Sequence, residues 1–234
     1  MKKTNFKYDE GVFFPEQNAH NLSNQDLKTV ESFHNLYFKL LEKRSGLQIS
    51  WLGHQTGKIP FDLWLYQELI YKERPDVIIE TGTHFGGSGV FLATICALIG
   101  KGQVISIDLY PKENLPKCDR LTYLSGSSIS NKIISKVDKI TENKEKILVI
   151  LDSNHTKDHV YQELILYSKY IKKGDLLIVE DTFLNGHPSH NDYGPGPTEA
   201  INLFLKENDE FKIDRSLEKF LLTLNYKGFL RKVI

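Results

Sequence analysis

The chain of 234 residues has few cysteines, no surplus of either charge and no long apolar run. Its two cysteines, Cys96 and Cys118, are too few for a disulfide framework and lack the spacing of a zinc knuckle. Lys plus Arg equals Asp plus Glu at 30 each, so no net field attracts nucleic acid or an anionic membrane. We therefore expect two reduced thiols and no nucleic-acid partner.

Segments that would direct the chain into or across a membrane are also missing from the sequence. The apolar run Val90–Ile99 is far too short to span a bilayer. Residues 1–10 are polar and lack the apolar core of a secretory signal. The sequence therefore predicts a cytoplasmic protein without a transmembrane segment.

Short apolar runs alternate with longer amphipathic segments from residue 77 onward. The predicted strands are Val77–Thr81, Val104–Asp108, Ile147–Asp152 and Leu176–Glu180, with one more before Ser125. The predicted helices are Asp26–Lys43, Asp62–Lys72, Ser88–Ile99, one from Asn131, Lys157–Tyr170 and Thr198–Lys206. Strands that alternate with helices in this way indicate a parallel sheet covered on both faces.

The tail of the chain changes this rhythm. Phe211–Asp214, Phe220–Leu224 and Phe229–Lys232 are predicted as closely spaced strands, with a turn at Asn225–Gly228. An antiparallel edge on the parallel sheet accounts for them. The predicted fold class is therefore α/β, a doubly wound, mostly parallel seven-stranded sheet with an antiparallel C-terminal edge. Residues 1–50 are predicted to form a helical N-terminal extension, and residues 51–234 the main domain.

A glycine-containing turn follows the first predicted strand. Gly82 and Gly86 allow positive φ and close approach of a ligand to the backbone, and Ser88 opens the next helix. The turn contains neither the G-x-G-x-x-G dinucleotide fingerprint nor the Gly-Lys-Ser/Thr of a phosphate-binding loop. Glu80, just before the turn, suits a cationic ligand better than a pyrophosphate. A tight turn without a ligand remains the alternative.

Two further polar groups follow the second and third strands. Asp108, 28 residues after Glu80, can accept hydrogen bonds from both hydroxyls of a ribose. The stretch that contains Ser125 and Ser127 can surround an adenine. The alternatives are a helix cap or a surface acid for Asp108. For the stretch with Ser125 and Ser127, the alternative is a turn that caps the helix from Asn131. Together with Glu80, these groups favour the S-adenosylmethionine site of a class I methyltransferase.

Three carboxylates follow the fourth and fifth strands. Asp152, Glu180 and Asp181 are expected within a few ångströms of one another, where they would repel strongly unless a cation lies between them. Oxygen ligands favour a hard ion such as Mg²⁺. His155, three residues after Asp152, is placed to accept a hydroxyl proton near neutral pH. The alternative makes the acids helix caps and His155 a solvated turn residue.

A second histidine cluster raises the alternative of an iron-dependent oxidoreductase. His190-Asn191-Asp192 forms half of a 2-His-1-carboxylate site, but no histidine follows His190 in the sequence to complete it. His187, His190 and Asp192 are instead expected in a mobile loop over the pocket. A non-catalytic cofactor-binding subunit is the remaining alternative, since a fold alone does not establish chemistry.

Motifs from about residue 45 to the C-terminus resemble the cephalosporin hydroxylase (CmcI-type) family. They are Trp51-Leu52-Gly53, Lys58-Ile59-Pro60, Asp62-Leu63-Trp64, Arg74-Pro75-Asp76, Glu80-Thr81-Gly82, Gly86-Gly87-Ser88, Leu151-Asp152-Ser153, His155-Thr156, Val179-Glu180-Asp181-Thr182, Gly194-Pro195-Gly196-Pro197, Leu222-Thr223-Leu224-Asn225 and Gly228 with Leu230. Despite its name, the family is similar to class I S-adenosylmethionine-dependent methyltransferases, including rhamnosyl and macrolide-sugar O-methyltransferases. The resemblance gives no role to Trp51 or Lys58.

This resemblance implies a Rossmann-like methyltransferase domain over 51–234 and a set of site residues. Asp152, Glu180 and Asp181 would hold Mg²⁺, and His155, with Asp152, would be catalytic. The cofactor would contact Glu80, Gly82, Gly86, Ser88, Asp108, Ser125 and Ser127. The expected function is Mg²⁺-dependent O-methylation of a sugar hydroxyl in a glycan, glycolipid or glycosylated small molecule. The apolar segments at both ends are compatible with a homo-oligomer.

Overall fold

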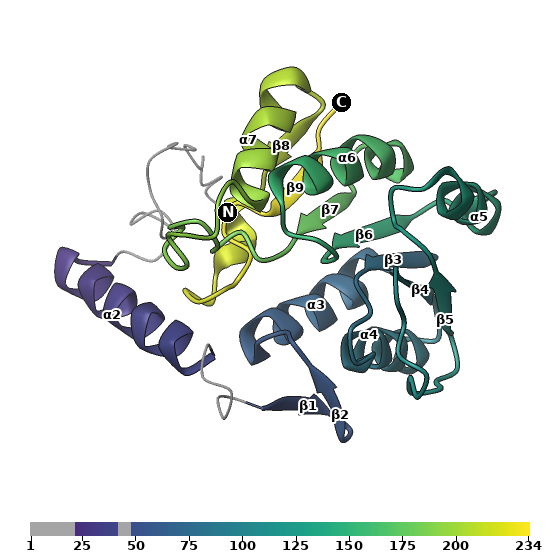
Figure 1. The fold of residues 1–234 in the computed structure, drawn as a ribbon, viewed down its shortest axis with the longest axis horizontal. Helices are drawn as coiled ribbons and strands as arrows, with labels where there is room; N and C mark the ends of the chain where they lie inside the picture. Colours follow the sequence, from purple (N-terminus) through teal and green to yellow (C-terminus); the bar gives the residue numbers. More distant parts are fainter. Residues whose placement is uncertain (1–21, 42–47) are drawn as a thin grey trace, which may run out of the picture.

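A seven-stranded sheet with helices on both faces forms the centre of the computed structural model, which describes residues 22–41 and 48–234 (Figure 1). The strand order is β5-β4-β3-β6-β7-β9-β8, with parallel pairing from β5 to β7 and antiparallel pairing of β9 to both neighbours. The strands of the sheet are β3 (Val77–Thr81), β4 (Gln103–Asp108), β5 (Leu121–Ser125), β6 (Ile147–Leu151), β7 (Leu176–Val179), β8 (Phe211–Ile213) and β9 (Phe229–Lys232). This is the predicted fold class, with its antiparallel C-terminal edge.

The helices lie on the two faces because the strands are apolar on both sides. They are α3 (Pro60–Glu73), α4 (Gly87–Leu98), α5 (Asn131–Thr141), α6 (Lys157–Tyr167) and α7 (Pro197–Glu207), with short 3₁₀ turns η1 (Ser168–Tyr170) and η2 (Arg215–Glu218). In β3, Val77 and Ile79 pack with α5, α6 and α7, whereas Ile78 between them packs with α3 and α4. Alternate residues of a strand point to opposite faces, so burial on both sides requires the continuous apolar runs seen in the sequence.

The order of the strands reverses between β3 and β6. From β3 the chain builds outward through β4 and β5, and then returns to β6 on the other side. The carboxyl ends of β3 and β6 therefore lie side by side, and the backbone N–H of Asp152 donates to the carbonyl oxygen of Thr81 over 3.0 Å. Ligands of open α/β sheets bind at such a reversal.

The N-terminal part contributes α2 (Asn24–Leu41) and a hairpin of β1 (Ile49–Trp51) and β2 (His54–Thr56). The helix predicted over 26–43 is confirmed in its described part, since residues 42 and 43 lie outside the described residues. The hairpin was not predicted. The polar segment 1–10 also lies outside the described residues. The boundary between 50 and 51 stays a prediction and falls within β1.

The prediction of a strand at Phe220–Leu224 is wrong. The segment is largely buried, but its backbone bonds to side chains and loops instead of a neighbouring strand. The N–H of Leu224 donates to Asp62 Oδ2 over 3.0 Å, and its carbonyl oxygen accepts from Phe183 N over 3.3 Å. Leu221 has φ of +65°, which interrupts any extended run. The turn predicted at Asn225–Gly228 is present and leads into β9.

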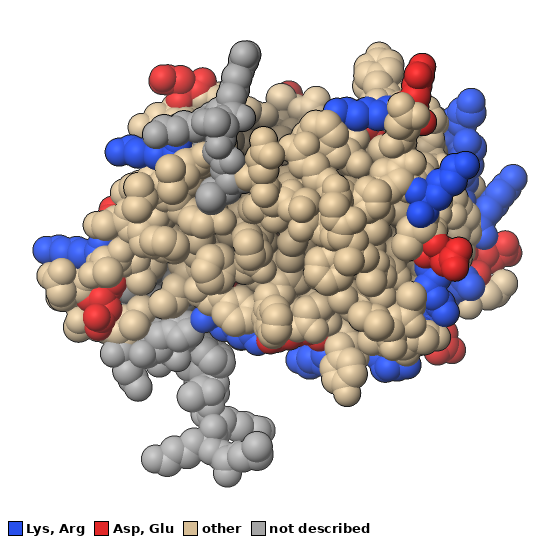
Figure 2. Space-filling model, turned by 90° about the horizontal axis from the view of Figure 1, so that it is seen from below, with Lys and Arg blue, Asp and Glu red and all other residues tan. Residues whose placement is uncertain are grey.

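Uncharged side chains cover most of the face seen from below, while lysines, arginines and acids lie mainly toward its rim (Figure 2). Within the described residues, no helix has both the length and the hydropathy needed to cross a bilayer.

Candidate active site

A buried lysine joins the ends of three neighbouring strands of the sheet. Lys58 lies in the loop between β2 and α3, and only 3% of its side chain is exposed. Its Nζ is 2.7 Å from Glu180 Oε1, 2.8 Å from Asp152 Oδ2 and 3.8 Å from Glu80 Oε1. These carboxylates follow or end β7, β6 and β3. The cation that the acidic cluster was predicted to require is thus partly supplied by the chain itself.

Burial and neighbouring charges act in opposite directions on the pKa of Lys58. Desolvation alone would lower the pKa of Lys58, but the carboxylates of Asp152, Glu180 and Glu80 outweigh it and hold the pKa well above its ordinary value. The ammonium group is therefore permanently charged at neutral pH. Burial, with the neighbouring charge of Asp152, raises the pKa of Glu180 to about 7. One ammonium does not fully compensate this set of carboxylates.

A second donor, supported by a side chain from near the C-terminus, holds the same oxygen of Glu180 that Lys58 contacts. The hydroxyl of Tyr66 on α3 donates to Glu180 Oε1 over 2.7 Å, and Asn225 Nδ2 donates to the Tyr66 hydroxyl over 3.0 Å. Asn225 Oδ1 in turn accepts from the backbone N–H of Asp181 over 3.1 Å. All of these side chains except Asp181 are buried. The network fixes the backbone after β7, and with it the direction of both acids.

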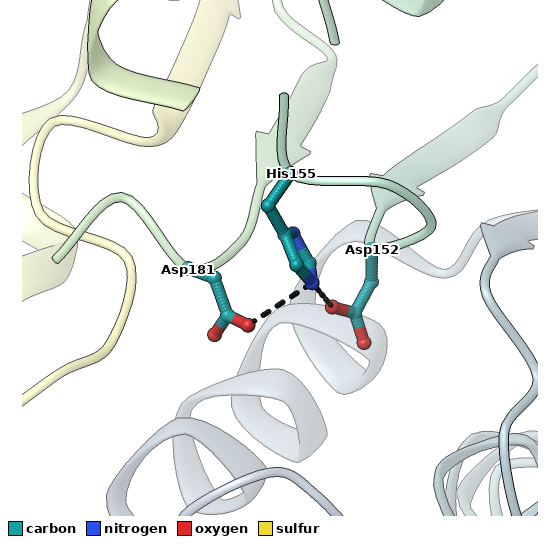
Figure 3. A group of neighbouring side chains, drawn as sticks. All are labelled: Asp152, His155 and Asp181. Atoms are coloured by element: carbon teal, nitrogen blue, oxygen red, sulfur yellow. Dashed lines mark ion pairs between the residues drawn. The ribbon is translucent and has the colours of Figure 1, made fainter. Parts of the chain in front are cut away.

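A second group lies on the other side of Asp152 (Figure 3). His155 Nε2 is 3.2 Å from Asp181 Oδ2 and 3.9 Å from Asp152 Oδ1. One ligand atom from each of Asp152, His155 and Asp181 lies within 4.8 Å of the others, the only such group of His, Cys, Asp and Glu among the described residues. All three are partly exposed, so the group is open to a ligand.

The pKa of His155 reflects two opposing effects. Burial would lower the pKa, but the carboxylates of Asp181 and Asp152 outweigh it and raise the pKa above the ordinary value of 6.5. The imidazole therefore gains affinity for a proton from the acids beside it. A histidine of this kind can accept a proton from a bound hydroxyl.

Adjacent residues Glu180 and Asp181 point to different sides of the site. Glu180 contacts Lys58 and Tyr66, while Asp181 contacts His155. Asp181 has φ of +54°, in the left-handed region that non-glycine residues rarely adopt. Asp152 joins the two sides because one carboxylate oxygen faces Lys58 and the other faces His155. The predicted metal set of Asp152, Glu180 and Asp181 is therefore within one network, but Glu180 is bound by Lys58 and Tyr66.

The predicted cofactor residues lie along the same edge of the sheet. Glu80 is fully buried at the end of β3, and its Oε2 accepts from Ser106 Oγ over 2.7 Å. Its Oε1 is buried and accepts no hydrogen bond from the described residues. Asp108 accepts backbone N–H groups, from Thr83 and His84 at Oδ2 and from Tyr110 at Oδ1. Oδ2 is therefore filled by two donors, whereas Oδ1 accepts one and retains capacity for a further donor.

The glycines of the turn after β3 have a structural reason of their own. A Cβ on Gly82 would lie 1.8 Å from the carbonyl oxygen of Asp152, and Gly82 has φ of +87°. A Cβ on Gly86 would lie 2.8 Å from Pro116 Cδ, and one on Gly87 would lie 2.2 Å from the carbonyl oxygen of Gln55. The glycines thus allow β3, β6 and the hairpin to approach each other. A small pocket, open to solvent, adjoins this turn and reaches Lys58, Ser88 and Asp152.

The remaining predicted cofactor residues lie at the end of β5 and just after it. Ser125 ends β5, and Ser127 precedes Ser128, whose hydroxyl bonds to Nε2 of His159 over 3.1 Å. The same histidine nitrogen is 3.1 Å from Ser153 Oγ, next to Asp152. The loop predicted to contact adenine and the loop that carries Asp152 therefore share one histidine. Sequence reasoning gave His159 no role.

The histidines considered for an iron site contact other partners, although His190 lies near enough to Asp181 to act electrostatically on its carboxylate. His187 Nε2 bonds to Glu199 Oε1 over 2.8 Å, and the ring of His190 packs edge-on against Phe183 at 5.5 Å. Neither His190 nor Asp192 belongs to a metal-ligand group of three within the part of the chain that the structure describes.

Comparisons with known proteins assign the chain to a family. The family model for rhamnosyl O-methyltransferase/CmcI matches residues 44–233. Rhamnosyl O-methyltransferases of Mycobacterium bovis and Mycobacterium tuberculosis are 34% identical over 208 residues, covering 86% of this chain and 84% of theirs. The chain belongs to this family. The Mycobacterium leprae member is 34% identical over 187 residues, which is 77% of this chain and 82% of that protein.

Solved structures of the rhamnosyl O-methyltransferase/CmcI family share the fold. An apo structure of CmcI is 20% identical, covers 86% of this chain and 84% of that chain, and has a TM-score of 0.62. A CmcI structure with Mg and S-adenosylmethionine is 19% identical, covers 80% of this chain and 77% of that chain, and has a TM-score of 0.59. The family and the class I methyltransferase fold inferred from the sequence motifs are confirmed.

Sequence reasoning found most of the residues that surround the site but missed its internal links. Lys58 was noted within a motif without a role, and Tyr66 was not singled out. Asp62 and Tyr66 are one helical turn apart on a face of α3 that is otherwise apolar, and this pairing was a usable signal. No pattern in the sequence indicated that Glu180 and Asp181 contact different partners.

Proposed function

We propose that the protein is an S-adenosylmethionine-dependent O-methyltransferase that modifies a sugar hydroxyl with the help of a divalent cation, of which Mg²⁺ is the expected one. The observation that carries the proposal is the group of Asp152, His155 and Asp181 beside the glycine turn of β3, in a chain of the rhamnosyl O-methyltransferase/CmcI family. Two carboxylates and an imidazole, beside a turn that adjoins a pocket, combine a cation site with a candidate base.

The cofactor assignment is supported by an orphaned buried atom. Glu80 Oε1 accepts no hydrogen bond from the described residues, its charged contact being the Lys58 ammonium at 3.8 Å, and a buried acceptor without a hydrogen bond is costly. The amino group of the methionine portion of S-adenosylmethionine would meet that need. Asp108, with spare capacity on Oδ1, is assigned to the ribose, and Gly82, Gly86, Ser88, Ser125 and Ser127 border the same edge. When bound, the cofactor supplies an activated methyl group.

The cation assignment is supported by the chemistry of the donor set. Asp152 Oδ1 and Asp181 Oδ2 both face His155 Nε2, and hard divalent ions prefer such oxygen ligands. Glu180 remains a predicted third ligand, although in the present geometry its Oε1 bonds to Lys58 and Tyr66. When bound, the ion provides Lewis acidity toward an acceptor oxygen. The CmcI structure with Mg and S-adenosylmethionine is consistent with this assignment.

His155 is the proposed general base. Its imidazole lies between the two carboxylates, which orient it and stabilise the imidazolium that forms on proton transfer. The proton would move from the acceptor hydroxyl to His155 Nε2 as the oxygen attacks the methyl group. Holding the hydroxyl and the methyl group in contact would supply much of the rate.

The acceptor is proposed at the level of a chemical class. Relatives that are 34% identical are named rhamnosyl O-methyltransferases, so a deoxysugar or related sugar hydroxyl is the first acceptor to examine. A small-molecule glycoside, a glycan and a glycolipid all present this group. The chain's balance of 30 basic and 30 acidic residues favours a neutral acceptor over a polyanion.

The first experiment is calorimetric titration of S-adenosylmethionine into the full chain, with and without Mg²⁺. We expect micromolar binding, followed by Mg²⁺-dependent methylation in a screen of rhamnosides and other glycosides. Absence of binding under both conditions would overturn the proposal. Methylation that is unaffected by chelators would retain the methyltransferase and remove the cation from its mechanism.

The role of His155 has a direct test with a matched control. Replacement His155→Ala is expected to reduce kcat by roughly 10²–10⁴-fold, while S-adenosylmethionine binding remains. His54, an exposed histidine on β2, provides the control, because His54→Ala should leave kcat unchanged. A loss of less than a few-fold in His155→Ala would exclude it as the base.

A further inference from the structure

Lys58 is the one cation that contacts the ends of β3, β6 and β7 together within the described part of the chain. Its side chain is 3% exposed, and its partners Glu80 and Glu180 are 0% and 4% exposed. A lysine buried to this degree requires close acidic partners, and buried carboxylates equally require a cation. The charges on both sides therefore depend on one another.

We propose that Lys58 is an internal cation that takes the place of a divalent ion on Glu180 and Asp152, and that positions the remaining Asp152 oxygen toward His155 and Asp181. This inference rests on the proposed function, because it concerns the same cation site. It makes Lys58 a positioning residue, since its contacts are to carboxylates and not to reacting atoms.

The two oxygens of the Asp152 carboxylate face different partners. Asp152 Oδ2 lies 2.8 Å from Lys58 Nζ, while its Oδ1 faces His155 Nε2 at 3.9 Å. A carboxylate is planar, so fixing one oxygen also fixes the direction of the other. The ammonium group thus sets the geometry of a ligand atom that belongs to the group around His155.

Glu180 is held at one oxygen by Lys58 and by a second donor. Glu180 Oε1 contacts both Lys58 Nζ, at 2.7 Å, and the hydroxyl of Tyr66, at 2.7 Å. Two donors hold this oxygen, and Glu180 is not among the ligands of the group formed by Asp152, His155 and Asp181. Lys58 therefore competes with a divalent ion for Glu180 Oε1 and lowers the affinity of the site for that ion.

The test compares the full chain with the variant Lys58→Met, which keeps an unbranched stem and removes the charge. We expect Lys58→Met to unfold at a lower temperature in EDTA, to recover in Mg²⁺, and to bind Mg²⁺ roughly tenfold or more tightly by calorimetry. The control Lys146→Met removes a lysine that contacts Glu73 Oε2 at 2.6 Å and Asp175 Oδ1 at 3.4 Å at the opposite end of the sheet. Its change in unfolding temperature should be the same in EDTA and in Mg²⁺.

Equal or weaker Mg²⁺ binding by Lys58→Met than by the unchanged chain would overturn the inference and leave the proposed function intact. The double variant Lys58→Met with Glu180→Gln covers the case of a single variant that does not fold. It should be more stable in EDTA than Lys58→Met alone, because the uncompensated carboxylate is gone. If the double variant is no more stable, packing of the lysine stem explains the loss and the inference fails.

The proposed function fails separately, when the unchanged chain binds neither S-adenosylmethionine nor Mg²⁺ and methylates no acceptor. The comparison of the single and double variants in EDTA still decides the role of Lys58 as an internal cation in that case.

Discussion

Gly82 is the position where a single methyl group should disturb the site most directly. A Cβ there would lie 1.8 Å from the carbonyl oxygen of Asp152. Ordinary contact requires about 3.5 Å, so the backbone of β3 or of the Asp152 loop must move by about 1.7 Å. Both belong to adjacent strands of the central sheet, which leaves little room for adjustment.

The expected cost of Gly82→Ala has two components. The φ of +87° adds about 1 kcal/mol for a residue with a Cβ, and the overlap adds about 1–3 kcal/mol. Gly174→Ala separates them, because Gly174 has φ of +90° and no atom within 4 Å of its Cβ position. Unfolding in urea should therefore show a loss of about 1 kcal/mol for Gly174→Ala and about 2–4 kcal/mol for Gly82→Ala.

Activity should separate the two variants further. A shift of about 1 Å in a positioned group can cost 10²-fold in rate, so kcat/KM for Gly82→Ala should fall by about 10² or more. Gly174→Ala, before β7 at the opposite edge, should retain the activity of the unchanged chain. Equal losses of stability and activity in the two variants would show that the close contact at Gly82 has no bearing on the position of Asp152.

Three further predictions concern stability. Burial lowers the pKa of His34 to about 4, so the unfolded chain binds more protons than the folded one between pH 4 and 6.5. The free energy of unfolding should therefore fall as the pH decreases across this range, by about 2 kcal/mol at pH 5. In urea titrations, His34→Gln should remove this pH dependence. Phe204→Ala should cost about 3–5 kcal/mol because Phe204 is fully buried on α7, and a loss below 1 kcal/mol would contradict its place in the core. Although burial acts to raise the pKa of Glu199, hydrogen bonds from His187 and Gly196 N outweigh it and lower the pKa. Glu199→Ala should therefore lower the free energy of unfolding by about 1 kcal/mol at pH 7. This difference from the unchanged chain should shrink as the pH falls through the native pKa of Glu199.

The parallel part of the fold was predictable because its signal is local. β3 was predicted with its observed bounds, since a strand buried on both faces needs a continuous apolar run such as Val77–Ile79. The positions of Glu80, Asp108 and Asp152 follow from the same signal, because the carboxyl ends of parallel strands share one edge. The strand predicted at Phe220–Leu224 failed because burial in a loop gives the same apolar letters as burial in a sheet.

The internal arrangement of the site was not predictable from local pattern. A lone lysine in a loop, such as Lys58, has no periodicity that distinguishes a buried residue from an exposed one. Its burial depends on the strand ends that surround it, which lie 22 to 122 residues away in the sequence. The separate directions of Glu180 and Asp181 depend on a positive φ at Asp181, held by Asn225 from the far end of the chain. Such features arise from tertiary contacts.

The packing of α2 against the segment before β9 ties the two ends of the chain to one structural unit. Phe38 on α2 shares a hydrophobic cluster with Leu222 and Leu224, and His34 bonds to the carbonyl oxygen of Leu221. Asn225, which follows Leu224, accepts a hydrogen bond from the backbone N–H of Asp181. A shortened chain that begins at residue 51 would lack α2 and expose Leu222 and Leu224 to water, and Leu224 directly precedes Asn225 of the site network. A catalytic fragment should therefore begin before α2.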